Sequence, residues 1–67
     1  MKIGTKVIIK DGQLQGKEGV VANPLVVELI CNKQGIPFSF KENNCVICTE
    51  DVNVFDWFDD GQLKEKQ

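Results

Sequence analysis

The chain has 67 residues and a formal net charge of −2, with eight lysines, ten acidic residues, and neither histidine nor arginine. A chain this short buries too little surface for two cores, so a single domain is expected. With 42% hydrophobic and 27% charged residues, its composition excludes a disordered chain and a membrane protein. Because the chain has no histidine, it cannot form a Ser-His-Asp catalytic triad. Because it has no long apolar segment, we expect a cytoplasmic protein.

Two short strands are predicted near the amino terminus, at residues 6–10 and 17–22. The Asp11-Gly12 pair that follows the first strand is a turn dipeptide, because its glycine adopts positive φ at no steric cost. The second strand ends at Asn23-Pro24, because proline lacks the N–H group that a strand ladder needs. These signals predict an antiparallel hairpin.

The most apolar run, residues 25–31, is predicted to be the central strand, because its length suits a strand better than a helix. A strand at 36–40 is expected next, with Phe38 and Phe40 on the same face. Further strands are predicted at 45–49 and 52–55.

The last residues are expected to close the domain. Residues 56–63 resemble a short helical turn that brings Leu63 onto the core, and residues 64–67 are expected to form a flexible tail. The chain is therefore predicted to form one all-β domain over residues 1–63, with five or six short, mostly antiparallel strands.

The amino-terminal spacing Val7-x-Ile9-x-x-Gly12-x-Leu14-x-Gly16-x-x-Gly19-x-Val21 resembles the KOW motif of large-subunit ribosomal proteins and of NusG- and Spt5-type elongation factors. The match covers residues 4–21 and implies a small SH3-like barrel. RNA-binding members carry basic residues in the first loop, whereas residues 11–16 here hold one acid and no base. The overall plan also resembles, more loosely, the small SH3-like photosystem subunits that help to dock ferredoxin, with residues 57–63 as the closing segment.

Cys45 and Cys48 have the C-x2-C spacing of a metal knuckle, and Cys31 is the third cysteine. A structural zinc site needs four ligands, and the chain offers three cysteines and no histidine. Residues three apart on a strand also face opposite sides. We therefore expect three buried, reduced and inert cysteines, with no metal and no cofactor; a redox or metal role for Cys45 and Cys48 is the alternative.

Charge is distributed unevenly, with four lysines and one aspartate in residues 1–17 but five acids and no lysine in residues 50–60. Trp57 and Phe58 are neighbours, so in an extended segment one of them faces outward. An exposed aromatic side chain amid acids suits a protein-binding anchor, while the alternative is that Trp57 closes the barrel end. The candidate protein-binding residues are Trp57, Phe58, Asp59, Asp60, Phe38 and Phe40.

The leading hypothesis is a noncatalytic binding module, an accessory or regulatory protein that docks on a larger protein assembly, including one with a basic surface. The alternative is a KOW-type module that binds RNA or a ribonucleoprotein through Lys10, Lys17 and Lys41. An isoelectric point near 4.9 disfavours nucleic acid. We expect a monomer or weak dimer, no membrane association, and no catalytic residue, because so small a barrel has little room for a cleft that perturbs a carboxyl pKa.

Overall fold

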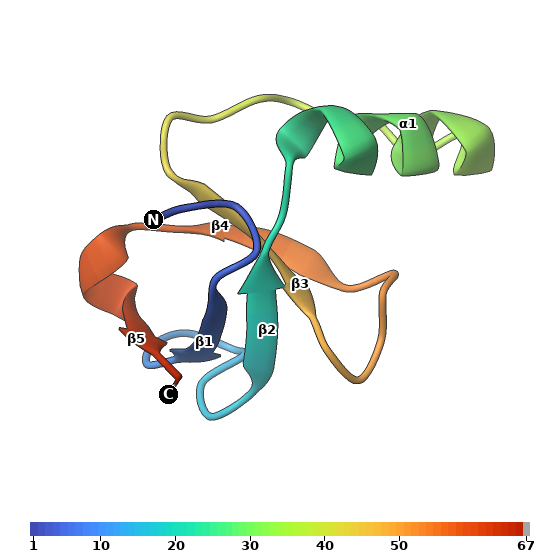
Figure 1. Cartoon of the computed structure of the whole chain (residues 1–67). Helices are drawn as coiled ribbons and strands as arrows, with labels where there is room; N and C mark the ends of the chain where they lie inside the picture. The colour runs from blue at the N-terminus through green and yellow to red at the C-terminus, as the bar shows by residue number, and fades with distance from the viewer. Residues whose placement is uncertain (67) are drawn as a thin grey trace.

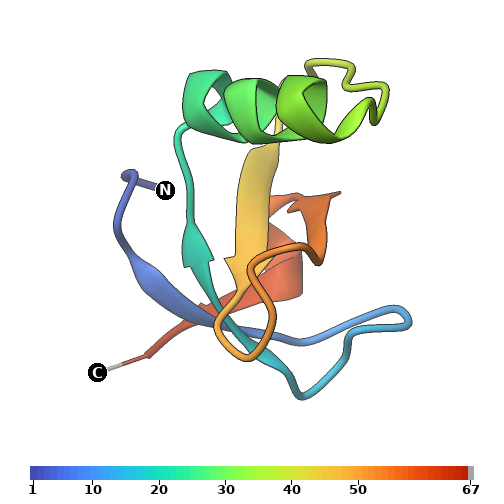
Figure 2. The same ribbon diagram turned by 90° about the vertical axis from the view of Figure 1, so that its right-hand side faces the viewer.

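Five antiparallel strands form one strongly curled sheet in the computed structural model, which describes residues 1–66 (Figures 1 and 2). The strands are β1 (Lys6–Ile9), β2 (Glu18–Val21), β3 (Asn44–Cys48), β4 (Phe55–Phe58) and β5 (Leu63–Glu65). Their order across the sheet is β4-β3-β2-β1-β5, so β4 and β5 are its two edges. The prediction of a small all-β domain with a barrel-like sheet is confirmed.

The β1–β2 hairpin forms where the sequence predicts it, with Val7 opposite Gly19. Gly12 and Gly16 in the connecting loop have φ values of 82° and 88°, which L side chains rarely adopt. Gly19 serves a different purpose, because a Cβ atom there would lie 2.5 Å from Cγ1 of Val46 and 2.8 Å from the backbone oxygen of Ile47. Only glycine lets β2 and β3 approach this closely.

The concave side of the sheet holds the main hydrophobic core. Its buried members are Val7, Ile9, Val21, Val46, Phe58 and Leu63. Leu14 from the β1–β2 loop packs against them. Leu63 follows the 3-10 turn η1 (Asp60–Gln62), so the prediction that a closing turn brings this residue onto the core is confirmed.

The predicted central strand at 25–31 is wrong, because these residues belong to the helix α1 (Pro24–Gln34). The helix begins where the Asn23 side chain accepts a hydrogen bond from the N–H of Leu25 at 3.0 Å, with Pro24 in its first turn. It ends at Gly35, whose φ of 70° places it in the left-handed region. These two end signals outweigh the strand preference of the β-branched residues between them.

Residues 36–40 form no strand, contrary to the prediction. Pro37 cannot donate to a ladder, and Phe38 instead packs by its side chain against Phe40, Phe55 and Trp57. The last hairpin is also shifted relative to the prediction, because residues 51–54 form a turn in which Asp51 accepts hydrogen bonds from the N–H groups of residues 53 and 54. As a result β4 covers 55–58 instead of 52–55.

The predicted flexible tail at 64–67 is wrong for Lys64 and Glu65, which pair with Ile8 and Val7 of β1. Lys66 extends this contact, with its N–H donating to the carbonyl of Lys6 at 2.8 Å. Pairing here satisfies backbone groups along β1 that would otherwise form a free edge. Gln67 lies outside the described residues.

Helix α1 lies across the top of the molecule in Figure 2, and its buried side chains pack against residues of β3 and β4 that face away from the main core. The contact is a second hydrophobic cluster centred on Val27, Cys31 and Cys45. Partly buried side chains surround it: Ala22, Phe38, Ile47, Phe55 and Trp57. Among residues 1–66, no helix has both the length and the apolar character that crossing a bilayer requires.

Candidate protein-binding surface

Helix α1 contacts the sheet along a single row, because Val27 and Cys31 are its only buried residues. The side chains on its other faces include Leu25 and Leu29, each 61% exposed, and Val26 and Ile30, 50% and 37% exposed. Residues four apart on a helix lie one above the other, so these residues form two adjacent rows. We call these four residues the α1 apolar face. A surface helix usually turns its large apolar side chains toward its own core, so four exposed ones on a single helix are a clear departure from an ordinary surface.

The carboxyl-terminal end of α1 is held against the loop between β3 and β4. The Gln34 side chain donates from Nε2 to Oδ1 of Asn53 at 3.1 Å. Beside this contact, Ile30, Ile36 and Val52 line a narrow cleft between helix and loop. Ile36 and Val52 are 40% and 66% exposed, so apolar surface continues beyond the α1 apolar face.

The predicted aromatic site is brought together only in part. Phe38 lies at its centre, with ring centroids 5.1 Å from Phe40 and 5.7 Å from Trp57. Trp57 is half-buried under Phe38 on the helix side of the sheet, while Phe40 is 52% exposed. Phe58 points to the opposite side and is buried in the main core, so its ring is not available as an exposed aromatic anchor. The tertiary fold therefore removes Phe58 from the candidate surface.

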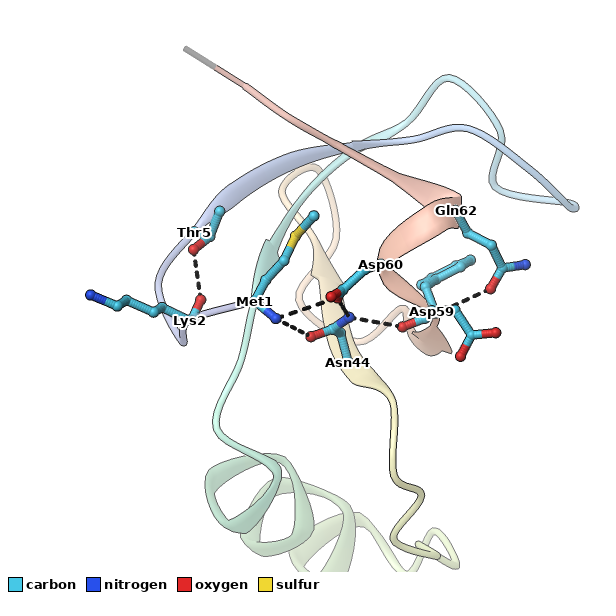
Figure 3. Close-up of polar contacts among 8 residues, drawn as sticks. Met1, Lys2, Thr5, Asn44, Asp59, Asp60 and Gln62 are labelled. Carbon is cyan, nitrogen blue, oxygen red and sulfur yellow. Dashed lines mark hydrogen bonds and ion pairs between the residues drawn. The ribbon is translucent and has the colours of Figure 1, made fainter.

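Asp59 and Asp60 are exposed, and both belong to a hydrogen-bonded end of the sheet (Figure 3). Asp60 Oδ1 accepts from Nδ2 of Asn44 at 2.7 Å and lies 3.4 Å from the Met1 ammonium group, which also donates to Oδ1 of Asn44 at 3.0 Å. The Asn44 hydrogen bond, followed by the ammonium group, lowers the pKa of Asp60 below its ordinary value. The Asp59 N–H donates to the Gln62 side chain at 2.9 Å, which closes the turn η1. These aspartates therefore have structural contacts of their own.

The three lysines proposed for nucleic-acid binding do not come together. Lys10 and Lys17 flank the β1–β2 loop, whereas Lys41 belongs to the connection between α1 and β3. Figure 1 shows that connection at the top of the molecule and the β1–β2 loop at the bottom. Lys17 is also paired with Glu50, with Nζ 3.4 Å from Oε2. Their positions do not provide the continuous basic patch that phosphate binding uses.

All three cysteines are free thiols and buried, as predicted. Cys45 belongs to the cluster beneath α1, whereas Cys48 faces the other side of β3 next to Leu14, so the two sulfurs do not converge. Burial, and secondly the neighbouring Cys31, raises the pKa of the Cys45 thiol to about 11. Burial also raises the pKa of Cys48. Within residues 1–66, no group of three His, Cys, Asp or Glu side chains is placed to hold a metal ion.

Comparisons with protein-family models, curated proteins and solved structures give no significant match to this chain. The KOW resemblance therefore remains a resemblance of spacing. Among the surfaces described above, the α1 apolar face is the one whose composition is unusual for a surface, and sequence reasoning missed it because it assigned these residues to a strand.

Proposed function

We propose that the chain is a noncatalytic protein-binding module that docks on a larger protein through the α1 apolar face. The observation that supports this proposal is the exposure of Leu25, Val26, Leu29 and Ile30 together on one short helix. Clustered exposed apolar side chains mark interaction sites, whereas single ones are ordinary. Complete burial of one such side chain is worth about 1.5–3 kcal/mol, so covering four half-exposed ones contributes on the order of 4 kcal/mol.

The shape of α1 favours a partner with a groove. A helix of 11 residues is about 16 Å long, and this one stands above the sheet as a ridge (Figure 2). Two such ridges in contact bury much less than the roughly 800 Å² per partner of a standard interface. A groove on the partner would enclose both rows of the α1 apolar face, as in known complexes in which an amphipathic helix lies in a hydrophobic groove.

Charge also argues against a second copy of the chain as the partner. Lys33 is exposed and lies one turn beyond Leu29 and Ile30. Parallel pairing of two copies would bring the two Lys33 ammonium groups together, and antiparallel pairing would place each near the positive amino-terminal end of the other helix. The partner that fits best is an apolar groove with a carboxylate at the end that Lys33 reaches.

Affinity capture from an extract of the cells that make the protein tests this function, with wild type, Leu29→Glu and Ile3→Glu as baits. Ile3 is 62% exposed and lies outside α1, so Ile3→Glu is a matched control for the loss of exposed apolar surface. We expect a protein that wild type and Ile3→Glu retain and Leu29→Glu loses. Titration of that purified protein should then show at least about tenfold weaker binding by Leu29→Glu. Equal retention by all three baits, or a wild-type dimer that Leu29→Glu dissociates in sedimentation equilibrium, would contradict the proposal.

A further inference from the structure

A groove of about 410 Å³ runs along the free edge of β4, away from the α1 apolar face. One wall consists of residues 54–58, and the other of residues 11–14 in the β1–β2 loop, with Gln62 completing the lining. Leu14 and Val54 give the groove apolar contacts. The four residues of β4 are about 14 Å long, enough to pair with four or five residues of an extended chain.

The backbone of β4 presents hydrogen-bonding groups to this groove. β4 is an edge strand that pairs only with β3 in the sheet. The Cys48 N–H donates to the carbonyl of Val54 at 2.9 Å, and the alternation of an antiparallel ladder then directs the backbone groups of Phe55 and Trp57 away from β3. In agreement, the Trp57 N–H donates to Oδ1 of Asp56 at 2.7 Å instead of to β3.

The groove is acidic. Asp11 and Asp56 line it, and no lysine of residues 1–66 does. The Asp56 carboxylate also occupies the acceptor position at the Trp57 N–H, where the carbonyl of an added strand would bind. A charged side chain on an edge strand of this kind prevents indiscriminate pairing, because an uncharged strand leaves the displaced carboxylate without a partner.

We propose that this groove binds an extended, lysine- or arginine-bearing segment of a partner protein, which adds to the sheet as a strand beside β4. The carbonyl of the added strand accepts from the Trp57 N–H, and the displaced Asp56 carboxylate pairs with the cation of the segment. Asp11 attracts a second cation from the opposite wall. The backbone supplies pairing and the aspartates supply selection for a basic sequence. This surface is distinct from the α1 apolar face and does not depend on the proposed function above.

Fluorescence polarisation with a labelled, end-blocked peptide of sequence Thr-Lys-Val-Lys-Val-Thr tests the proposal. We expect saturable binding that weakens at least about tenfold when glutamate replaces both lysines of the peptide, because the exchange turns attraction to Asp11 and Asp56 into repulsion. Two further peptides carry N-methyl groups, on the valine amides in one and on the lysine amides in the other. Alternate amides of a strand face its neighbour, so one of these two peptides should lose binding and the other should keep it.

Variants of the protein separate this site from the rest of the molecule. Asp56→Lys should weaken binding of the lysine peptide at least about tenfold, because it places a cation beside the cations of the peptide. Asp56→Asn should weaken it less, because the amide oxygen repels no cation and still accepts a hydrogen bond from a lysine of the peptide. Leu29→Glu should leave the affinity for the lysine peptide unchanged. A failure of the peptide test therefore does not contradict docking through the α1 apolar face, and a failure of docking does not contradict the peptide site. Absence of saturable binding up to about 1 mM peptide, equal binding of the glutamate peptide, or equal binding of both methylated peptides would each overturn the proposal.

Discussion

Replacing Gly19 by alanine tests how closely β2 and β3 pack. The added Cβ atom would lie 2.5 Å from Cγ1 of Val46 and 2.8 Å from the backbone oxygen of Ile47. Val46 is fully buried, so its side chain has no free space to rotate into, and the backbone oxygen moves only if the strands separate. Overpacking of this kind costs about 1–3 kcal/mol, and a contact with the backbone places Gly19→Ala toward the upper end.

The loss of conformational freedom in the unfolded chain offsets this cost by only about 0.4–1 kcal/mol. We therefore expect Gly19→Ala to lower the free energy of unfolding by about 2 kcal/mol. With an m value near 1 kcal/mol/M, the urea midpoint should fall by about 2 M. Urea unfolding followed by circular dichroism measures this shift.

Two other glycines provide matched controls for the same substitution. An alanine Cβ at Gly61 would meet no atom within 4 Å, so Gly61→Ala should change stability by less than about 0.5 kcal/mol. Gly12 is equally open but has a φ of 82°, so Gly12→Ala should cost about 1–2 kcal/mol through backbone strain alone. A Gly19→Ala protein as stable as Gly61→Ala would refute the close approach of β2 and β3.

Four further predictions concern the helix, the thiols, the acidic end and the rival function. Asn23→Ala should lower the free energy of unfolding by about 1 kcal/mol through loss of the helix cap, measured by urea unfolding; an unchanged midpoint would argue against the cap. Because the pKa of Cys45 is raised from 9.0 to about 11, the free energy of unfolding should fall by about 3 kcal/mol as the pH rises from the lower to the higher of these two values. If the Cys45 thiol causes this fall, the free energy of unfolding of Cys45→Ala should depend less on pH over the same range. The pKa of Asp60 is lowered, so its contribution to stability should be present above the ordinary carboxyl pKa and disappear as the pH falls below that value. The free energy of unfolding of Asp60→Asn should therefore decrease less at acid pH than that of wild type. Identical acid dependence of the two proteins would contradict this. A gel shift at low salt should show no binding to RNA or DNA, and tight, salt-sensitive binding would favour the KOW-type alternative.

Where local rules decide the structure, the sequence predicts it well. The β1–β2 hairpin depends on glycines that must adopt positive φ and on valine and isoleucine residues spaced two apart, and both requirements are visible within 16 residues. The same holds for the burial of Leu63 and of the three cysteines. The run at 25–31 is different, because its β-branched residues suit a strand while Asn23, Pro24 and Gly35 around it suit the ends of a helix.

The surface available to a partner was decided by the tertiary structure. The sequence shows that Trp57 and Phe58 must face opposite sides of β4, and the curl of the sheet selects Phe58 for the core and places Trp57 beneath Phe38. The apolar face of α1 is exposed because only Val27 and Cys31 of the helix pack against the residues of β3 and β4. Burial of a side chain depends on what packs against it from elsewhere in the chain, and this information is absent from any local pattern of residues.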